Sequence, residues 1–266
     1  MLEFIIILIL IFLFAIRCRG NHPGVEALKG WNYAHRGFHG NGLPENSMGA
    51  FKAALGRGYG IELDIHLLAD GNLAVMHDSL LNRTTGEAGR IEDLTTADLG
   101  KYRLEGTDET IPEFMDVLTL YNGKAPLIVE LKSVDGNHAA LCEAACRMLE
   151  SYKGVYCLES FDPRCIQWLK KHRPHLIRGQ LVYKYVGTRA EMPDILKFLL
   201  THNLLNFATV PDFIAYRYCD RKYSFTTDIC RRLWKAEAVT WTLKTKEEYD
   251  TAVAEGWIPI FEGFEP

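Results

Sequence analysis

The chain has 266 residues, with 30 Lys and Arg against 34 Asp and Glu for a net charge of −4, and 48% of its residues are hydrophobic. This composition excludes a disordered or collagen-like chain, and the lack of a basic excess argues against a nucleic-acid partner. The seven cysteines form no CxxC pair, so we expect them to be reduced packing residues rather than a disulfide framework or a zinc site.

An apolar segment opens the chain. Residues 4–16 read FIIILILIFLFAI and are followed at once by two arginines within three residues. A helix over residues 1–16 would reach roughly 24 Å, short of the roughly 30 Å hydrocarbon core of a bilayer. Glu3 precedes the run and no small-residue cleavage site follows it, which disfavours a signal peptide. We therefore expect residues 1–20 to be a single hydrophobic membrane-anchor helix, with the following domain in the cytoplasm; a buried core helix is the alternative.

Short β-branched runs alternate with segments of helical periodicity from Trp31 onward, and no flexible linker interrupts them. Strands are expected at residues 32–34, 60–65, 73–76, 127–131, 155–158, 177–181, 204–208, 238–242 and 258–261. The second and third of these flank Asp70-Gly71 and predict a hairpin. Helices are expected around residues 48–55, 141–149, 163–169, 195–199, 229–233 and 249–253.

A strand followed by a helix, about eight times over, predicts that residues 21–266 form a single α/β domain, a TIM (β/α)8 barrel. An open doubly wound sheet is the alternative. The sequence disfavours it because no glycine-rich phosphate-binding loop follows the first strand.

Polar residues gather where the first strands end, which is where a barrel carries its chemistry. Residues two apart on a strand share a face, so Glu62 and Asp64 project together, as do Glu130 and Lys132. Three converging carboxylates repel one another unless something positive lies among them. Oxygen ligands suit a hard divalent cation, Mg²⁺ or Ca²⁺, better than zinc. For one Glu-x-Asp pair alone, a water-exposed strand edge is the simpler interpretation.

Three more side chains, His35, Arg36 and His77, come from strand ends and join Lys132. Arg36 and Lys132 supply fixed positive charge of the kind that a phosphoryl group requires. His35 and His77 titrate near neutrality, so one could take a proton from the nucleophile while the other gives one to the leaving oxygen. A lone histidine is more often structural, but two beside three carboxylates and two cations favour a catalytic pair.

An ordered series of motifs covers this region: residues 35–37 (HRG), 43–47 (LPENS), 61–64 (IELD), 70–71 (DG), 77–78 (HD), 82–85 (NRTT) and 130–132 (ELK). The series resembles that of the glycerophosphodiester phosphodiesterase family, with weaker echoes at residues 160–163 and 239–242. The resemblance implies a TIM-barrel enzyme that uses a divalent metal to cleave glycerophosphodiesters to glycerol 3-phosphate and an alcohol.

The resemblance also implies a role for each of the seven residues: metal ligands Glu62, Asp64 and Glu130, acid–base residues His35 and His77, and phosphate contacts Arg36 and Lys132.

The sequence departs from the family pattern at its end, where Ile-Thr-Asp-x-Pro is replaced by IFEGFEP at residues 260–266. Ser47 stands where the family commonly has Thr, and we expect it to cap a helix. His66 lies further along its strand than the carboxylates and is expected to be a supporting or solvated residue. Trp241 could pack on the glycerol end of a substrate or simply within the barrel.

Three functions from different classes remain open at this point. The first is hydrolysis of small glycerophosphodiesters, such as those left by phospholipid deacylation. The second is a lysophospholipase D, in which the same chemistry acts on a membrane lysophospholipid. The third, disfavoured by the intact set of seven residues, is an inactive barrel kept as a membrane-tethered binding module.

Overall fold

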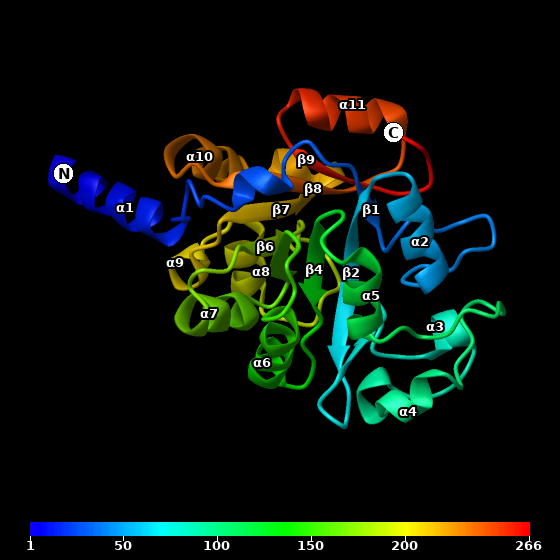
Figure 1. Cartoon of the computed structure of the whole chain (residues 1–266). Coiled ribbons are helices and arrows are strands. Elements are labelled where there is room, and N and C mark those ends of the chain that lie inside the picture. The colour runs from blue at the N-terminus through cyan, green and yellow to red at the C-terminus, as the bar shows by residue number, and fades with distance from the viewer.

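Eight parallel strands close into a barrel that helices surround in the computed structural model, which describes residues 1–266 (Figure 1). The order around the barrel is β1-β2-β4-β5-β6-β7-β8-β9, and β1 pairs with both β2 and β9, which closes the ring. Strand β3 is outside the ring and pairs antiparallel with β2, as expected for a hairpin. The predicted TIM barrel is therefore confirmed.

The strands are β1 Tyr33–His35, β2 Gly60–Leu67, β3 Leu73–Val75, β4 Leu127–Leu131, β5 Tyr156–Ser160, β6 Arg178–Val182, β7 Phe213–Arg217, β8 Glu237–Leu243 and β9 Ile258–Phe261. The α-helices are α1 Leu2–Ala15, α2 Met48–Gly56, α3 Asn82–Thr85, α4 Thr96–Leu99, α5 Phe114–Tyr121, α6 His138–Leu149, α7 Pro163–His172, α8 Asp194–Thr201, α9 Asn206–Thr209, α10 Phe225–Leu233 and α11 Lys246–Ala254.

The sixth strand of the barrel, β7, lies elsewhere than its sequence pattern indicated. The strand expected at residues 204–208 is wrong, because this apolar run enters the short helix α9. The strand is Phe213–Arg217, which pairs with β6 and β8. A short apolar run fits a strand and a buried helical turn equally well, so periodicity alone could not separate them.

Two apolar layers hold the barrel together, one on each side of the strands. Side chains such as Ile128, Leu181 and Phe213 pack together in one buried cluster. The alternate strand positions, such as Leu63 and Val129, pack against the surrounding helices in a larger cluster. The inward positions nearest the carboxyl ends of β2 and β4 are polar instead, and this change of character places the candidate site.

The prediction of a membrane anchor at residues 1–20, with the domain held in the cytoplasm, is wrong. Helix α1 has 14 residues, which at 1.5 Å per residue span roughly 21 Å, well below the roughly 30 Å of a hydrocarbon core. No helix in the structure has both the length and the apolar character needed to cross a membrane. Figure 1 shows α1 extending away from the barrel beside α9 and α10, and its ring contacts there are Phe12 with Phe225 and Phe14 with Phe207.

Candidate active site

Three buried carboxylates meet at the carboxyl ends of β2 and β4, as the spacing of Glu62, Asp64 and Glu130 indicated. One oxygen from each lies within 4.8 Å of the others. The sheet register explains this closeness, since Asp64 lies directly beside Glu130 on the neighbouring strand. A fourth carboxylate, Glu159, lies beside Glu130 on β5. The barrel therefore concentrates negative charge at a place that water barely reaches.

Burial and repulsion between the carboxylates shift the pKa values of this cluster. Burial, together with the charges of Asp64 and Glu130, raises the pKa of Glu62 well above its ordinary value. Burial also raises the pKa of Glu130, to about 7, against the opposing effect of Lys132. Burial acts the same way on Asp64, but Lys132, His77 and Arg36 outweigh it and hold that pKa far below the usual range. The protein's own cations thus satisfy one carboxylate and leave the other two short of positive charge.

The donor set fits a divalent cation. Asp64 Oδ1 is buried, and its charged partner is the Lys132 ammonium, 2.9 Å away. The same ammonium lies 2.7 Å from Glu130 Oε1, and Asn46 donates a hydrogen bond to Asp64 Oδ2 at 2.8 Å. Oxygen atoms that are close together, buried and incompletely paired are what Mg²⁺ or Ca²⁺ takes as ligands.

His35, the last residue of β1, reaches this cluster from the other side. Its Nε2 is 3.8 Å from Glu62 Oε2, and its Nδ1 is 2.7 Å from Glu262 Oε2. The hydrogen bond from His35 lowers the pKa of Glu262 to about 2, so this carboxylate is ionised and must accept the bond. The proton of neutral His35 therefore sits on Nδ1, which leaves Nε2 with a free lone pair facing the carboxylates.

His77 has a carboxylate partner of its own. Its Nδ1 lies 2.6 Å from Asp78 Oδ1, and Asp78 is further bound by Arg83. Arg83 also pairs with Glu45 at 2.6 Å, and Glu45 is the 3.0 Å partner of Arg36. One chain of ion pairs thus fixes both His77 and Arg36.

Two adjoining cavities open onto these residues. The smaller, about 40 Å³, is lined by both histidines and by Arg36, Glu62, Glu130 and Glu159, together with Phe161, Leu181, Trp241 and Ile260. The larger, a groove of about 700 Å³, begins at Glu130 and Lys132 and continues along an apolar wall that includes Phe161, Tyr183, Met192, Leu196 and Leu200. All seven residues singled out in the sequence therefore converge on one region, since Asp64 contacts both Arg36 and Lys132.

The three supporting residues noted in the sequence are also placed. The Ser47 side chain accepts a hydrogen bond from the Ala50 N–H at 3.1 Å, so it caps α2 as expected. His66 is buried and bonds to Glu92 at 2.7 Å and to the His77 carbonyl, so it is a supporting residue and not solvated. Trp241 lines the small cavity while its indole N–H donates to a barrel carbonyl.

Two residues of the site escaped the sequence analysis. Glu262 lay in the segment that departs from the family pattern, and Glu159 lay one residue past the end of an expected strand. Glu262 directly follows β9, and Glu159 is the next-to-last residue of β5. A position at the carboxyl end of a barrel strand was therefore the sequence signal that could have identified both as site residues. The contact between Glu262 and His35 depends on closure of the barrel, because β9 pairs with β1 beside it.

Comparison with known proteins agrees with this geometry. The model of the glycerophosphoryl diester phosphodiesterase family matches residues 35–260. The chain belongs to this family. Among its relatives, glycerophosphodiester phosphodiesterase 1 of Mus musculus is 38% identical over an alignment of 269 positions, which covers 85% of this chain and 76% of the mouse protein.

Other relatives match over a shorter stretch. A glycerophosphodiester phosphodiesterase of Bacillus altitudinis is 36% identical over 155 residues, 54% of this chain and 63% of its own. Lysophospholipase D GDPD1 of Rattus norvegicus is 31% identical over 133 residues, 45% of this chain and 41% of its own. The chain thus matches less than two thirds of the length of both of these family members.

A solved structure shows the same fold. The Oleispira antarctica phosphodiesterase, determined in complex with the product sn-glycerol-3-phosphate, superposes with a TM-score of 0.70 at 20% identity, covering 87% of this chain and 92% of that one.

Proposed function

We propose that this protein hydrolyses glycerophosphodiesters to sn-glycerol 3-phosphate and an alcohol with the help of a bound Mg²⁺ or Ca²⁺. The observation that carries the proposal is the convergence of three buried carboxylates, two histidines and two cationic side chains on one region, where five of the seven line the small cavity and the other two, Asp64 and Lys132, pair with its lining residues. Membership of the family and the product-bound Oleispira antarctica structure support the same substrate class.

Glu62, Asp64 and Glu130 would hold the cation, which supplies positive charge to a phosphate oxygen when it is bound. Arg36 would contact another phosphate oxygen, since this residue lines the cavity and its guanidinium is fixed by Glu45. Lys132, between Asp64 and Glu130, would stabilise the negative charge that grows on the phosphate oxygens in the transition state.

The two histidines divide the proton transfers. His35 is the base in this proposal, because its proton lies on Nδ1 toward Glu262 and its free Nε2 can accept a proton from the attacking water or glycerol hydroxyl. His77 is the acid in this proposal: Asp78 holds its Nδ1–H, so the ring acts as the imidazolium, and its second proton, on Nε2, passes to the departing alkoxide. Both rings line the same cavity, so a phosphodiester bound there would lie between them.

The direct test is incubation of the purified protein with glycerophosphocholine and either cation, with sn-glycerol 3-phosphate measured enzymatically. We expect product with the wild type and none with Glu130→Gln. A folded protein that releases no glycerol 3-phosphate from any glycerophosphodiester would contradict the proposal and favour the binding module.

A second candidate, lysophospholipase D activity, is favoured by the apolar groove. The groove joins the small cavity through Glu130 and Phe161 and is walled by α8 residues Leu196 and Leu200. A volume of about 700 Å³ is more than a glycerol or choline group needs, whereas an acyl chain could use its apolar wall. The rat relative carries the name lysophospholipase D.

One substitution separates the two substrates. Leu196→Asn should raise the KM for lysophosphatidylcholine about tenfold, because a buried leucine contact contributes about 1.5–3 kcal/mol, and should leave glycerophosphocholine turnover unchanged. Ile195→Asn is the matched control, since Ile195 is 67% exposed on the same helix and lies outside the groove. Equal effects of both substitutions, or no turnover of the lysolipid at all, would rule out the second candidate.

A further inference from the structure

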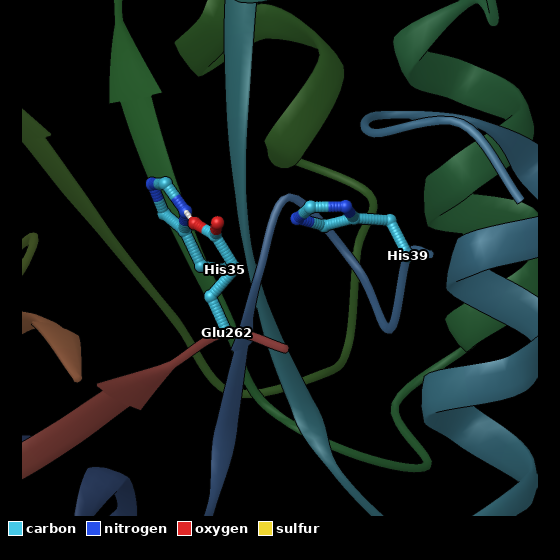
Figure 2. Close-up of side chains that lie close together, drawn as sticks. All are labelled: His35, His39 and Glu262. Carbon is cyan, nitrogen blue, oxygen red and sulfur yellow. Dashed lines mark hydrogen bonds and ion pairs between the residues drawn. The ribbon is translucent and has the colours of Figure 1, made fainter. Parts of the chain in front are cut away.

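A second group of potential metal ligands lies beside the carboxylate cluster. His35, His39 and Glu262 each offer a ligand atom, and these atoms lie within 4.8 Å of one another. Figure 2 shows the His39 ring approaching from the loop after β1, with a ring nitrogen turned toward the hydrogen-bonded His35 and Glu262. The Nε2 of His39 is buried and has no hydrogen-bond partner, although buried polar atoms normally have one.

The donor set differs in kind from the carboxylate cluster. Two imidazoles and one carboxylate are a common zinc ligand set, in which a fourth position stays open to water or another ligand. The oxygen-only set of Glu62, Asp64 and Glu130 suits Mg²⁺ or Ca²⁺ instead. The two groups share no ligand, so each could bind its own cation.

The distances allow a zinc ion after small adjustments. Ligand atoms about 2.0–2.2 Å from a tetrahedral ion lie roughly 3.3 Å from each other. The 2.7 Å separation of His35 Nδ1 and Glu262 Oε2 must widen slightly, and the His39 ring must move in by at most about 1.5 Å. Lys244, the other charged group facing Glu262, lies 3.5 Å from Oε1 and is 67% exposed, so it can turn into water.

We propose that His35, His39 and Glu262 bind Zn²⁺ and that this ion switches off the base of the active site. In the metal-free pair, His35 keeps its proton on Nδ1 and a lone pair on Nε2. Zinc takes the lone pair of Nδ1, so the ring proton must sit on Nε2. The number of protons on the ring stays the same, but Nε2 can no longer accept one from the nucleophile.

The inhibitory half of this inference rests on the proposed function, whereas the binding half does not. Co²⁺ is therefore used as a probe, because a four-coordinate site with nitrogen ligands gives strong visible absorption and an oxygen-only octahedral site gives weak absorption. The intact chain is titrated with Co²⁺ in the presence of excess Mg²⁺, and its spectrum needs no turnover. His39→Asn removes one ligand, and the exposed His175→Asn is the matched control.

We expect visible absorption from the wild type and His175→Asn and its loss in His39→Asn. In glycerophosphocholine assays with excess Mg²⁺, all three should be equally active without zinc. The zinc concentration for half inhibition should be at least about tenfold higher for His39→Asn.

A His39→Asn protein that keeps the cobalt spectrum, or that zinc inhibits at the wild-type concentration, would overturn the site. A wild type that gives the spectrum but keeps full turnover in zinc would overturn the inhibitory role.

Discussion

At the scale of single residues, His35 and Asp64 take their protonation state from a partner on a different strand. Glu262, after β9, fixes the proton of His35 at the end of β1. Lys132, after β4, keeps Asp64 of β2 ionised. For these two residues the protonation state is therefore set by the closed barrel and not by neighbours in sequence, and two sets of residue changes test the roles assigned to the pocket.

The first change removes either histidine. His35→Ala and His77→Ala should each lower kcat by roughly 10²–10⁴-fold without unfolding the barrel. A nitrophenyl ester needs no protonation of its leaving group, so it should largely rescue His77→Ala and leave His35→Ala slow. Rescue of His35→Ala instead would reverse the two roles, and wild-type rates for both variants on glycerophosphocholine would remove the mechanism.

The second change tests Glu262 as a positioning residue. Glu262→Gln can no longer hold a charge against His35 Nδ1, so we expect kcat to fall about tenfold to hundredfold with little change in KM. Glu265→Gln is the matched control, because Glu265 is exposed and pairs only with Arg57. If Glu262→Gln raised KM and left kcat alone, the residue would belong to substrate binding and not to the base.

The limits of the sequence are clearest at these residues. The carboxylates on β2 and β4 could be found because a two-residue spacing fixes their common face whatever the rest of the chain does. Glu262 could not, because its contact joins residues 227 apart in the chain. No local pattern encodes which strand closes the ring.

At the scale of elements, the barrel interior is filled by interlocking side chains from neighbouring strands. Phe213 of β7 is fully buried and lies over Gly179 of β6, its partner in the sheet register. A Cβ placed on Gly179 would meet the Phe213 ring at 2.0 Å. The glycine thus makes room for the aromatic ring that fills this part of the barrel. The pairing of Gly179 with Phe213 also places the strand next to β6 at Phe213–Arg217, whereas the sequence analysis had placed it at the apolar run of residues 204–208.

Gly179→Ala should therefore destabilise the protein by about 1–3 kcal/mol, through overpacking of the barrel interior. Gly56→Ala is the control, because Gly56 lies in α2 with open space at its Cβ and should change stability by at most about 1 kcal/mol, in the stabilising direction. Urea unfolding measures both free energies. A Gly179→Ala protein as stable as the wild type would show that β6 and β7 are not packed as described.

At the scale of the whole molecule, the carboxyl ends of the strands form one continuous region of charge, while the helices and the remaining strand positions supply the apolar framework. The framework followed from the alternation of strands and helices, which is why the barrel could be predicted. The same framework holds buried carboxylates whose ionisation destabilises the fold. This cost should be measurable as a dependence of stability on pH.

Glu62 illustrates the cost. Its folded-state pKa is raised by burial and by Asp64 and Glu130, so the metal-free fold loses stability as pH rises from the unfolded pKa toward the folded one. Glu62→Gln removes this loss. In chelator, its melting temperature should exceed that of the wild type by more at pH 8 than at pH 5.

Glu87→Gln, at an exposed position, is the control for Glu62→Gln and should show no such pH dependence. A Glu62→Gln protein less stable than the wild type at pH 8 would show that the three carboxylates do not repel one another in the folded state.

Metal dependence of glycerophosphocholine hydrolysis tests the central claim most directly. The protein is stripped with chelator, dialysed against metal-free buffer, and assayed for glycerol 3-phosphate before and after Mg²⁺ or Ca²⁺ is added. We expect no product before addition and restored product after it, with Glu62→Gln, Asp64→Asn and Glu130→Gln each needing more metal or staying inactive. Full turnover by the stripped wild type would contradict the account.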